Sequence, residues 1–260
     1  MTPLNGARSV SAALVVAEPD RRLLTWINRF RFVTATLIAE RFGVSVQATS
    51  RRFARLQSAG LLGRERATRL EEYAVFLTPA GARLLGLPRR RAPRVHVHRE
   101  HDLAVVWLAS RIERSTAMRV LSERECRHLQ ARGEERFSVD VERATGRGDR
   151  RRWPDLVLEK DGGRVAVEIE FAPKGSGRLG AIVDAYLQSV AFGEVRFLVS
   201  HPATARRLAR IVQAETASTQ TRELFPIRGP KVVVSPWTGA SAGERAAVQL
   251  AIDRTADDGR

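Results

Sequence analysis

The eighteen residues from Trp153 to Glu170 read WPDLVLEKDGGRVAVEIE, and they consist of two apolar runs separated by a turn signal. The turn, Asp161-Gly162-Gly163, is typical of a tight hairpin, because its residues tolerate the positive φ angles that such turns require. Residues 155–158 and 164–171 are therefore expected to form a pair of antiparallel strands.

Acidic side chains are concentrated at the open end of this expected hairpin. Side chains alternate between the two faces of a strand, so Glu168 and Glu170 are expected on one face and Val167 and Ile169 on the other. Asp155 begins the first strand. The pattern predicts a local cluster of negative charge.

The hairpin lies within a longer alternation of strands and helices. Further strands are expected at 118–121, 137–141, 194–200 and 231–235, and helices at 99–113, 179–192 and 203–214. Residues 147–152, with four arginines and one glycine, are expected to form a mobile loop. The order predicts an α/β domain with a central mixed sheet.

The preceding part of the chain has helical periodicity. Helices are expected over 21–30 and 34–42, with a third helix after Ser45 that extends to Gly60. Gly43 suits a left-handed turn, and Ser45 is a good helix cap. A short helix, a tight turn and a second helix with a polar outer face form the layout of a helix-turn-helix.

The third helix is expected to present two different faces. Val46, Thr49, Phe53 and Leu56 are expected to point inward. Arg and Gln can pair with base edges, and Ser can reach phosphates. The candidate DNA-binding residues in this helix, at its cap and in the basic stretch after it are Ser45, Gln47, Ser50, Arg51, Arg52, Arg55, Arg64, Arg66 and Arg69.

The stretches GVSVQATSRRFARLQSAGLLGRE (43–65) and YAVFLTPAG (73–81) together resemble winged helix-turn-helix proteins of bacterial regulators and plasmids. The resemblance covers residues 20–87 and implies that two short strands with an arginine-bearing tip form the wing. The alternative is a helical bundle whose helices are basic by chance.

The charge distribution agrees with a nucleic-acid partner. The chain has 260 residues and a net charge of +15, of which residues 1–98 contribute +11 and residues 99–260 contribute +4. A concentrated positive field attracts polyanions. Codon bias is the alternative explanation, because arginine supplies 41 of the 44 basic residues. Few aromatics lie outside expected core positions, which disfavours an RNA-directed protein.

The cellular location follows from cysteine content and hydropathy. A single cysteine, Cys126, cannot form an internal disulfide, which fits a reducing compartment. No apolar run approaches the roughly 18 residues of a membrane helix. We therefore expect a cytoplasmic protein without membrane contact.

The order helix, strand, strand beginning with Pro-Asp155, strand with Glu168-x-Glu170, then helix resembles the PD-(D/E)XK (restriction-endonuclease-like) superfamily. The resemblance implies a mixed-sheet α/β nuclease fold in which Asp155 and Glu168 bind a divalent metal. The third motif position, usually Lys, is Glu170 here, and Lys174 follows within one turn. Together with the preceding helices and His98-x2-His101, the stretch is also similar to replication-relaxation proteins of plasmids and integrative elements.

These residues define a candidate catalytic centre. Mg²⁺ or Mn²⁺ is expected, because hard cations prefer carboxylate oxygen. Glu170 is a candidate ligand or general base, and Lys174 a candidate for stabilising developing negative charge. Without a cation, Glu168 and Glu170 would repel each other. The alternative is a nuclease-derived fold in which both glutamates face solvent or pair with arginines.

The expected organisation is a flexible leader (1–19), a winged helix-turn-helix domain (20–87), a basic linker (88–97), a restriction-endonuclease-like domain (98–237) and a tail (238–260). His96, His98 and His101 are expected to cap or pack rather than bind zinc, because other ligands are missing nearby.

Two functions remain open from sequence. One is a double-stranded DNA-binding protein with a metal-dependent endonuclease or nickase centre, acting on plasmid or mobile-element DNA. The other is a non-catalytic regulator or a replication/transfer accessory factor. A homodimer is compatible with the winged-helix resemblance, but the sequence does not decide the oligomeric state.

Overall fold

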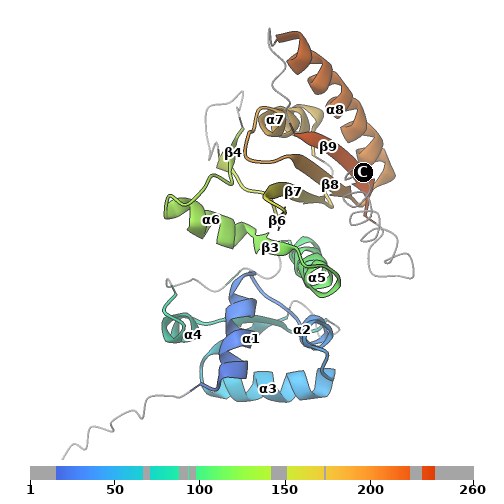
Figure 1. Cartoon of the computed structure of the whole chain (residues 1–260). Coiled ribbons are helices and arrows are strands. Elements are labelled where there is room, and N and C mark those ends of the chain that lie inside the picture. The colour runs from blue at the N-terminus through green and yellow to red at the C-terminus, as the bar shows by residue number, and fades with distance from the viewer. Residues whose placement is uncertain are drawn as a thin grey trace, which may run out of the picture.

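A computed structural model of the chain describes residues 16–66, 71–87, 93, 98–141, 151–172, 174–222 and 230–237. This part of the chain forms a smaller unit around a two-stranded sheet and a larger unit around a five-stranded sheet (Figure 1). The expected tail, most of the leader and the basic linker, and Arg69 lie outside the described residues.

The smaller unit contains the three expected helices and the two expected strands. Its elements are α1 (Glu18–Asn28), α2 (Ala35–Phe42), α3 (Val46–Ser58), β1 (Leu62–Glu65), β2 (Ala74–Leu77) and α4 (Pro79–Leu84). Strands β1 and β2 are antiparallel, and a single bridge joins Val33 to Val75 beside them. The short helix α4, capped by the Thr78 hydroxyl, was not expected from the sequence.

The turn between α2 and α3 has the expected geometry. Gly43 ends α2 in the left-handed region, with φ of 65°. The Ser45 hydroxyl accepts a hydrogen bond from the Ala48 amide at 3.1 Å and so caps α3. The local chemistry of two residues therefore fixes where one helix ends and the next begins.

The expected inner face of α3 was wrong at its first position. Thr49, Phe53 and Leu56 are buried, but the Val46 side chain is 45% exposed. Val46 is the first residue of α3, and it is exposed together with Val44, which lies two residues before it. Helical spacing alone does not reveal where the core stops.

The larger unit alternates helices and strands as expected, and it also contains elements that were not expected. They are α5 (Arg99–Ser115), β3 (Arg119–Ser122), α6 (Glu123–Ala131), β4 (Val139–Asp140), β5 (Arg151–Arg152), β6 (Leu156–Lys160), β7 (Gly163–Glu170), α7 (Ser176–Leu187), β8 (Glu194–Val199), α8 (Pro202–Arg222) and β9 (Lys231–Pro236).

The five-stranded sheet is mixed, in the order β3-β6-β7-β8-β9. β6 pairs antiparallel with both β3 and β7, whereas β8 is parallel to β7 and to β9. The two parallel connections run through α7 and α8, as parallel strands require a crossover. The structure confirms the expected α/β fold class with a central mixed sheet.

The hairpin at the centre of the sheet is confirmed. Asp161 and Gly162 both have positive φ angles, and Lys160 pairs with Gly163 across the turn. Val167 and Ile169 pack in a core cluster that includes residues of α5, whereas Ala166 belongs to a second cluster with residues of α7 and α8. Helices therefore cover both faces of this hairpin (Figure 1).

Three expectations for the larger unit need correction. The strand expected at 137–141 is reduced to β4, which pairs with β5 outside the main sheet. Arg151 and Arg152 form β5 rather than a loop, whereas 147–150 lie outside the described residues. Helix α6 was missed, although Ser122 and Glu125 form a capping box at its start.

Helical spacing predicts that Leu103, Val106 and Trp107 form the buried stripe of α5, and this prediction was only partly right. Val106 is buried, but Leu103 and Trp107 are half-buried. The buried face instead includes Ala104, Leu108, Ala109 and Ile112. Small residues lie on this face because α5 packs closely against the sheet on one side and the smaller unit on the other.

Charged hydrogen bonds connect the two units. The Glu113 carboxylate on α5 accepts hydrogen bonds from Trp26 Nε1 at 3.0 Å and Arg41 Nε at 3.0 Å, and it also pairs with Arg29. Burial raises the pKa of Glu113, but Arg29 and its other donors outweigh this effect and lower it. Helix α1 is thereby held against the larger unit at its carboxyl end. No helix in the described residues is long and apolar enough to cross a membrane.

Candidate functional site

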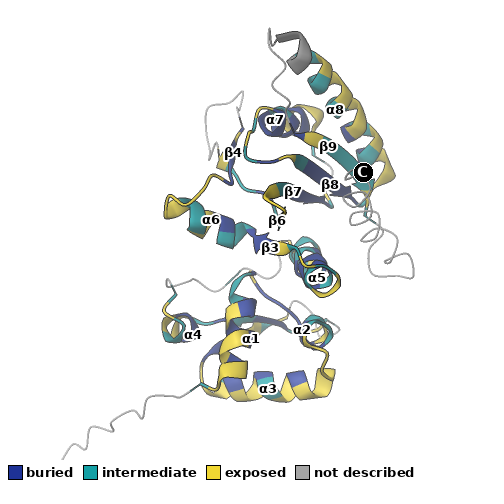
Figure 2. Cartoon of the chain, viewed as in Figure 1, coloured by how far each residue is buried: buried dark blue, intermediate teal, exposed yellow. Residues whose placement is uncertain are grey.

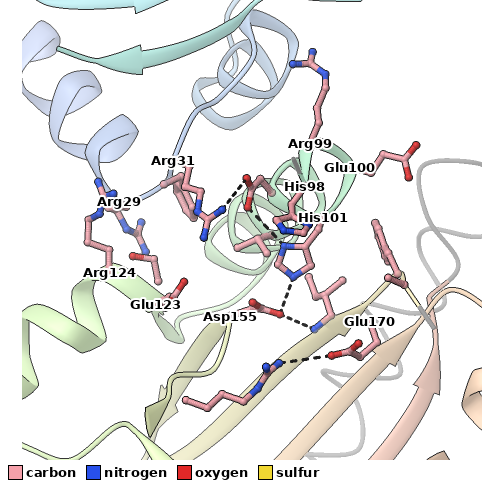
Figure 3. A pocket seen from close by; sticks show the side chains of 18 of the residues that line it. Arg29, Arg31, His98, Arg99, Glu100, His101, Glu123, Arg124, Asp155 and Glu170 are labelled. Atoms are coloured by element: carbon pink, nitrogen blue, oxygen red, sulfur yellow. Dashed lines mark hydrogen bonds and ion pairs between the residues drawn. The ribbon is translucent and has the colours of Figure 1, made fainter. Parts of the chain in front are cut away.

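A pocket of about 980 Å³ lies where the two units meet (Figure 3). Its walls include Arg29 and Arg31 after α1, the first turn of α5, and the ends of β6 and β7. Asp155, Glu170 and Lys174, three of the four candidate catalytic residues, line this pocket. The fourth, Glu168, is fully buried behind it.

Asp155 occupies the position just before β6, where the hairpin opens. Its Oδ2 atom accepts hydrogen bonds from the Ile169 amide at 2.8 Å and from His101 Nε2 at 3.1 Å. Because Leu156 pairs with Val167, the same register places Asp155 opposite Glu168. Burial raises the pKa of Asp155, but His101 and the Ile169 amide outweigh it and lower the pKa.

His101 lies in the first turn of α5 and points into the pocket (Figure 3). Its Nδ1 atom is 3.6 Å from Asp102 Oδ1, and its Nε2 atom contacts Asp155. Burial lowers the pKa of His101, but these two carboxylates raise it to about 10. The imidazole is therefore protonated at neutral pH and acts as a cation beside Asp155.

Glu168 is engaged through both carboxyl oxygens. Arg152 donates from Nε to Oε1 at 3.0 Å and from Nη2 to Oε2, and Tyr186 donates from its hydroxyl to Oε1 at 2.5 Å. Burial raises the pKa of Glu168, with Arg152 acting against it. Glu168 has no exposed surface.

Glu170 is paired with two cations. Lys174 forms a hydrogen bond with Glu170 Oε1, and Arg152 Nη2 lies 3.6 Å from the same atom. Glu168 and Glu170 therefore share the strand face expected from sequence, because one arginine reaches both. Lys174 approaches from the segment before α7, as expected from its spacing.

The centre contains three carboxyl groups, Asp155, Glu168 and Glu170, and three cationic side chains, His101, Arg152 and Lys174. Arg152 and Lys174 offset the expected repulsion between Glu168 and Glu170. A cation held jointly by Asp155 and Glu168 does not fit this arrangement, because Arg152 and Tyr186 engage both oxygens of Glu168.

The described residues contain no group of three or more His, Cys, Asp or Glu side chains that could hold a metal ion. The proposed metal-binding role of Asp155 and Glu168 stays a prediction, as do the catalytic roles of Glu170 and Lys174. The four residues do converge at one end of the hairpin, which is the geometric requirement for acting together.

Sequence reasoning missed two members of this centre. Arg152 was assigned to a loop, and His101 was assigned to capping or packing. His101 is 54 residues from Asp155 in the sequence, so the sequence does not show that the two side chains are in contact. The only local signal was the position of Arg152, three residues before Asp155. Tyr186 also reaches the centre, from α7.

The second candidate surface is the outer face of α3. Gln47, Ser50 and Arg51 are exposed. Within the part of the chain that the structure describes, no hydrogen bond or ion pair engages these three side chains, so they are available to a partner. Figure 2 shows this face of α3 as largely exposed, at the end of the molecule away from the larger unit.

The other candidate DNA-binding residues of the helix have structural contacts. Ser45 caps α3. Arg52 Nε lies 2.6 Å and Arg55 Nη2 2.5 Å from the carboxylate of Asp20 on α1. The Arg55 side chain remains 64% exposed, compared with 29% for Arg52. Arg55 can therefore still be reached from solvent, whereas Arg52 mainly joins α3 to α1.

The basic residues after β1 stack on an aromatic ring. The guanidinium carbons of Arg64 and Arg66 lie 4.5 and 4.6 Å from the ring centroid of Tyr73. Both arginines are exposed. Arg69 lies outside the described residues.

The α3 surface and the pocket lie at opposite ends of α1. Asp20, in the first turn of α1, pairs with α3, whereas Arg29, just after α1, pairs with Glu113 and Glu125 of the larger unit. Figure 1 shows α1 extending between the two regions. They are therefore two separate candidate sites in one molecule.

Comparison with known proteins gives one match. The family model described as replication-relaxation matches residues 24–169, which run from α1 to β7 and include both Asp155 and Glu168. No curated protein and no solved structure matches the chain. Because the family model covers more than half of the 260 residues, the chain belongs to the replication-relaxation family.

Proposed function

We propose that the protein binds double-stranded DNA through α3 and the β1–β2 hairpin, and that it serves as a non-catalytic accessory factor in the replication of plasmid or mobile-element DNA. The family description supports a role in replication. The observation that carries the DNA-binding part is the exposed, unengaged row of Gln47, Ser50 and Arg51 on α3.

The geometry of the smaller unit supports this proposal. Helix α3 follows a tight turn after α2 and presents side chains that can pair with base edges. The antiparallel β1–β2 pair carries Arg64, and Arg66 follows directly after β1. Stacking on Tyr73 holds both guanidinium groups at the surface, where they suit phosphate contacts that fix the register of a reading helix.

The arrangement of the larger unit supports an accessory role. The order α5, β3, β6, β7, α7 agrees with the order that the PD-(D/E)XK resemblance implies, and α6, β4 and β5 are inserted between β3 and β6. The carboxyl groups at the corresponding positions are engaged by His101, Arg152 and Lys174. A nuclease-derived fold can be retained for binding or assembly without its chemistry.

Titration of a labelled DNA duplex, followed by fluorescence anisotropy, tests the proposal. Gln47→Ala with Arg51→Ala should weaken binding about 10-fold or more, because each good base contact contributes roughly 1–3 kcal/mol. The matched control is Arg210→Ala, since Arg210 is exposed on α8 in the larger unit. Equal losses for both variants, or no loss for the α3 variant, would contradict the proposal.

A second function is favoured by the convergence of Asp155, Glu170 and Lys174 on one pocket. It is a metal-dependent endonuclease or nickase in which Asp155 and Glu168 would hold Mg²⁺ or Mn²⁺, and it requires Arg152 to release Glu168 first. Nicking of a supercoiled plasmid in Mn²⁺ tests it. Cleavage by the wild type that is lost in Asp155→Ala, with duplex binding retained, would establish this function over the accessory role.

A further inference from the structure

Arg152 occupies a distinctive position in the carboxylate centre. Its side chain contacts two of the three carboxyl groups, bidentate to Glu168 and at 3.6 Å to Glu170. His101 contacts Asp155, and Lys174 contacts Glu170. Arg152 therefore lies between the two glutamates that share a strand face.

The contact between Arg152 and Glu168 is built into the fold. Arg152 is held in β5 by its pairing with Val139 of β4, and the chain then turns into β6 through Asp155. Glu168 lies in the central strand β7 with no exposed surface. Tyr186, also fully buried, donates its hydroxyl to Oε1 of the same carboxylate.

The planar guanidinium and a divalent cation require the same carboxylate oxygens. A bidentate arginine engages both oxygens of one carboxylate. A hard cation such as Mn²⁺ binds through those oxygens at about 2.1 Å, by analogy with Mg²⁺. Arg152 and Tyr186 together fill three of the roughly four acceptor positions of the Glu168 carboxylate, and Glu168 has no exposed surface, so the guanidinium stands in the place that a cation would need.

We propose that Arg152 is the resident cation of this centre, and that its side chain keeps divalent cations from a site formed by Glu168 and the neighbouring Asp155. The site becomes available when the guanidinium is removed. This inference does not depend on duplex binding by α3, so either can fail while the other stands.

The test measures Mn²⁺ binding by the full-length protein, from the loss of the free-ion signal in electron paramagnetic resonance. Arg152→Gln removes the positive charge and the bidentate guanidinium contact with Glu168 but keeps a polar side chain. We expect this variant to bind one Mn²⁺ at least about 10-fold more tightly than the wild type. Adding Glu168→Gln to the same variant should abolish the gain, because it removes the ligand that Arg152 had covered.

Arg136→Gln is the matched control. Arg136 pairs with Asp140 in β4, with both side chains more than half exposed. Removing this arginine also raises the local negative charge, but it uncovers no buried carboxylate. We expect no increase in Mn²⁺ affinity for this control. If its affinity rises as much as that of Arg152→Gln, the increase comes only from the loss of a positive charge, and the proposal is overturned.

Two further outcomes would overturn it. One is a folded Arg152→Gln variant, checked by circular dichroism, that binds Mn²⁺ no better than the wild type. The other is Mn²⁺ binding by the wild type itself. If the wild type binds one Mn²⁺ and the Asp155→Asn variant does not, the cation coexists with Arg152. If Arg152→Gln does not fold, Arg152→Lys replaces it, because a single ammonium cannot hold both oxygens, and its gain should be smaller but measurable.

Discussion

The outer face of α3 and the carboxylate centre use the same residue type in opposite ways. Arg51 is exposed on α3 and unengaged within the described residues, whereas Arg152 lies against a fully buried carboxylate. A positive charge is available to an outside anion only where the protein has not already neutralised it. The comparison therefore favours the smaller unit for the proposed duplex-binding surface, although the larger unit also contains many arginines.

The largest effect expected from this comparison concerns stability. Glu168→Ala should lower the free energy of unfolding by about 3 kcal/mol, because it leaves Arg152 and Tyr186 without their shared partner. Arg51→Ala should change it by less than about 0.5 kcal/mol, as is usual for exposed positions. Urea titration measures both. Similar values for the two variants would remove the distinction between the regions.

A smaller effect is expected in acid, where α1 meets α3. Burial raises the pKa of Asp20, but Arg55 and Arg52 outweigh it and lower the pKa below 3.8. The stability from this contact is therefore complete above about pH 4 and is lost as the pH falls through the lower folded-state value. We expect the advantage of the wild type over Asp20→Asn in unfolding free energy to shrink between pH 5 and pH 3. An advantage that stays constant or grows on acidification would contradict the assignment.

The smallest of these effects concerns the start of α3. Ser45→Ala should lower the free energy of unfolding by about 1 kcal/mol, because the Ala48 amide loses its capping oxygen. Ser45→Asp should retain most of the stability, since aspartate also caps well. Thermal unfolding of the three proteins measures the difference. An alanine variant as stable as the wild type would mean that the cap does not hold the turn.

The sequence predicted those parts of the fold that depend on local chemistry. Gly43 and Ser45 set the turn between α2 and α3, and Asp161 and Gly162 set the hairpin between β6 and β7. In each case a few neighbouring residues determine the backbone angles. The capping box of Ser122 and Glu125 was an equally local signal for α6, but it was overlooked.

The candidate site was predictable only in part. Strand alternation brought Glu168 and Glu170 to one face, and the turn placed Asp155 beside them. The contacts of His101 and Arg152 depend instead on how α5 and β5 pack against the hairpin. Such packing leaves no periodic trace in a single sequence, so the neutralising cations became visible only in three dimensions.

The most direct test is duplex binding in the presence of EDTA, comparing the wild type with the Gln47→Ala/Arg51→Ala variant and with Arg152→Lys. The wild type and Arg152→Lys should bind with similar affinity without any divalent cation, and the α3 variant should bind about 10-fold more weakly or worse. A wild type that binds only after Mg²⁺ or Mn²⁺ is restored, together with full binding by the α3 variant, would place the duplex at the carboxylate centre and contradict the central claim.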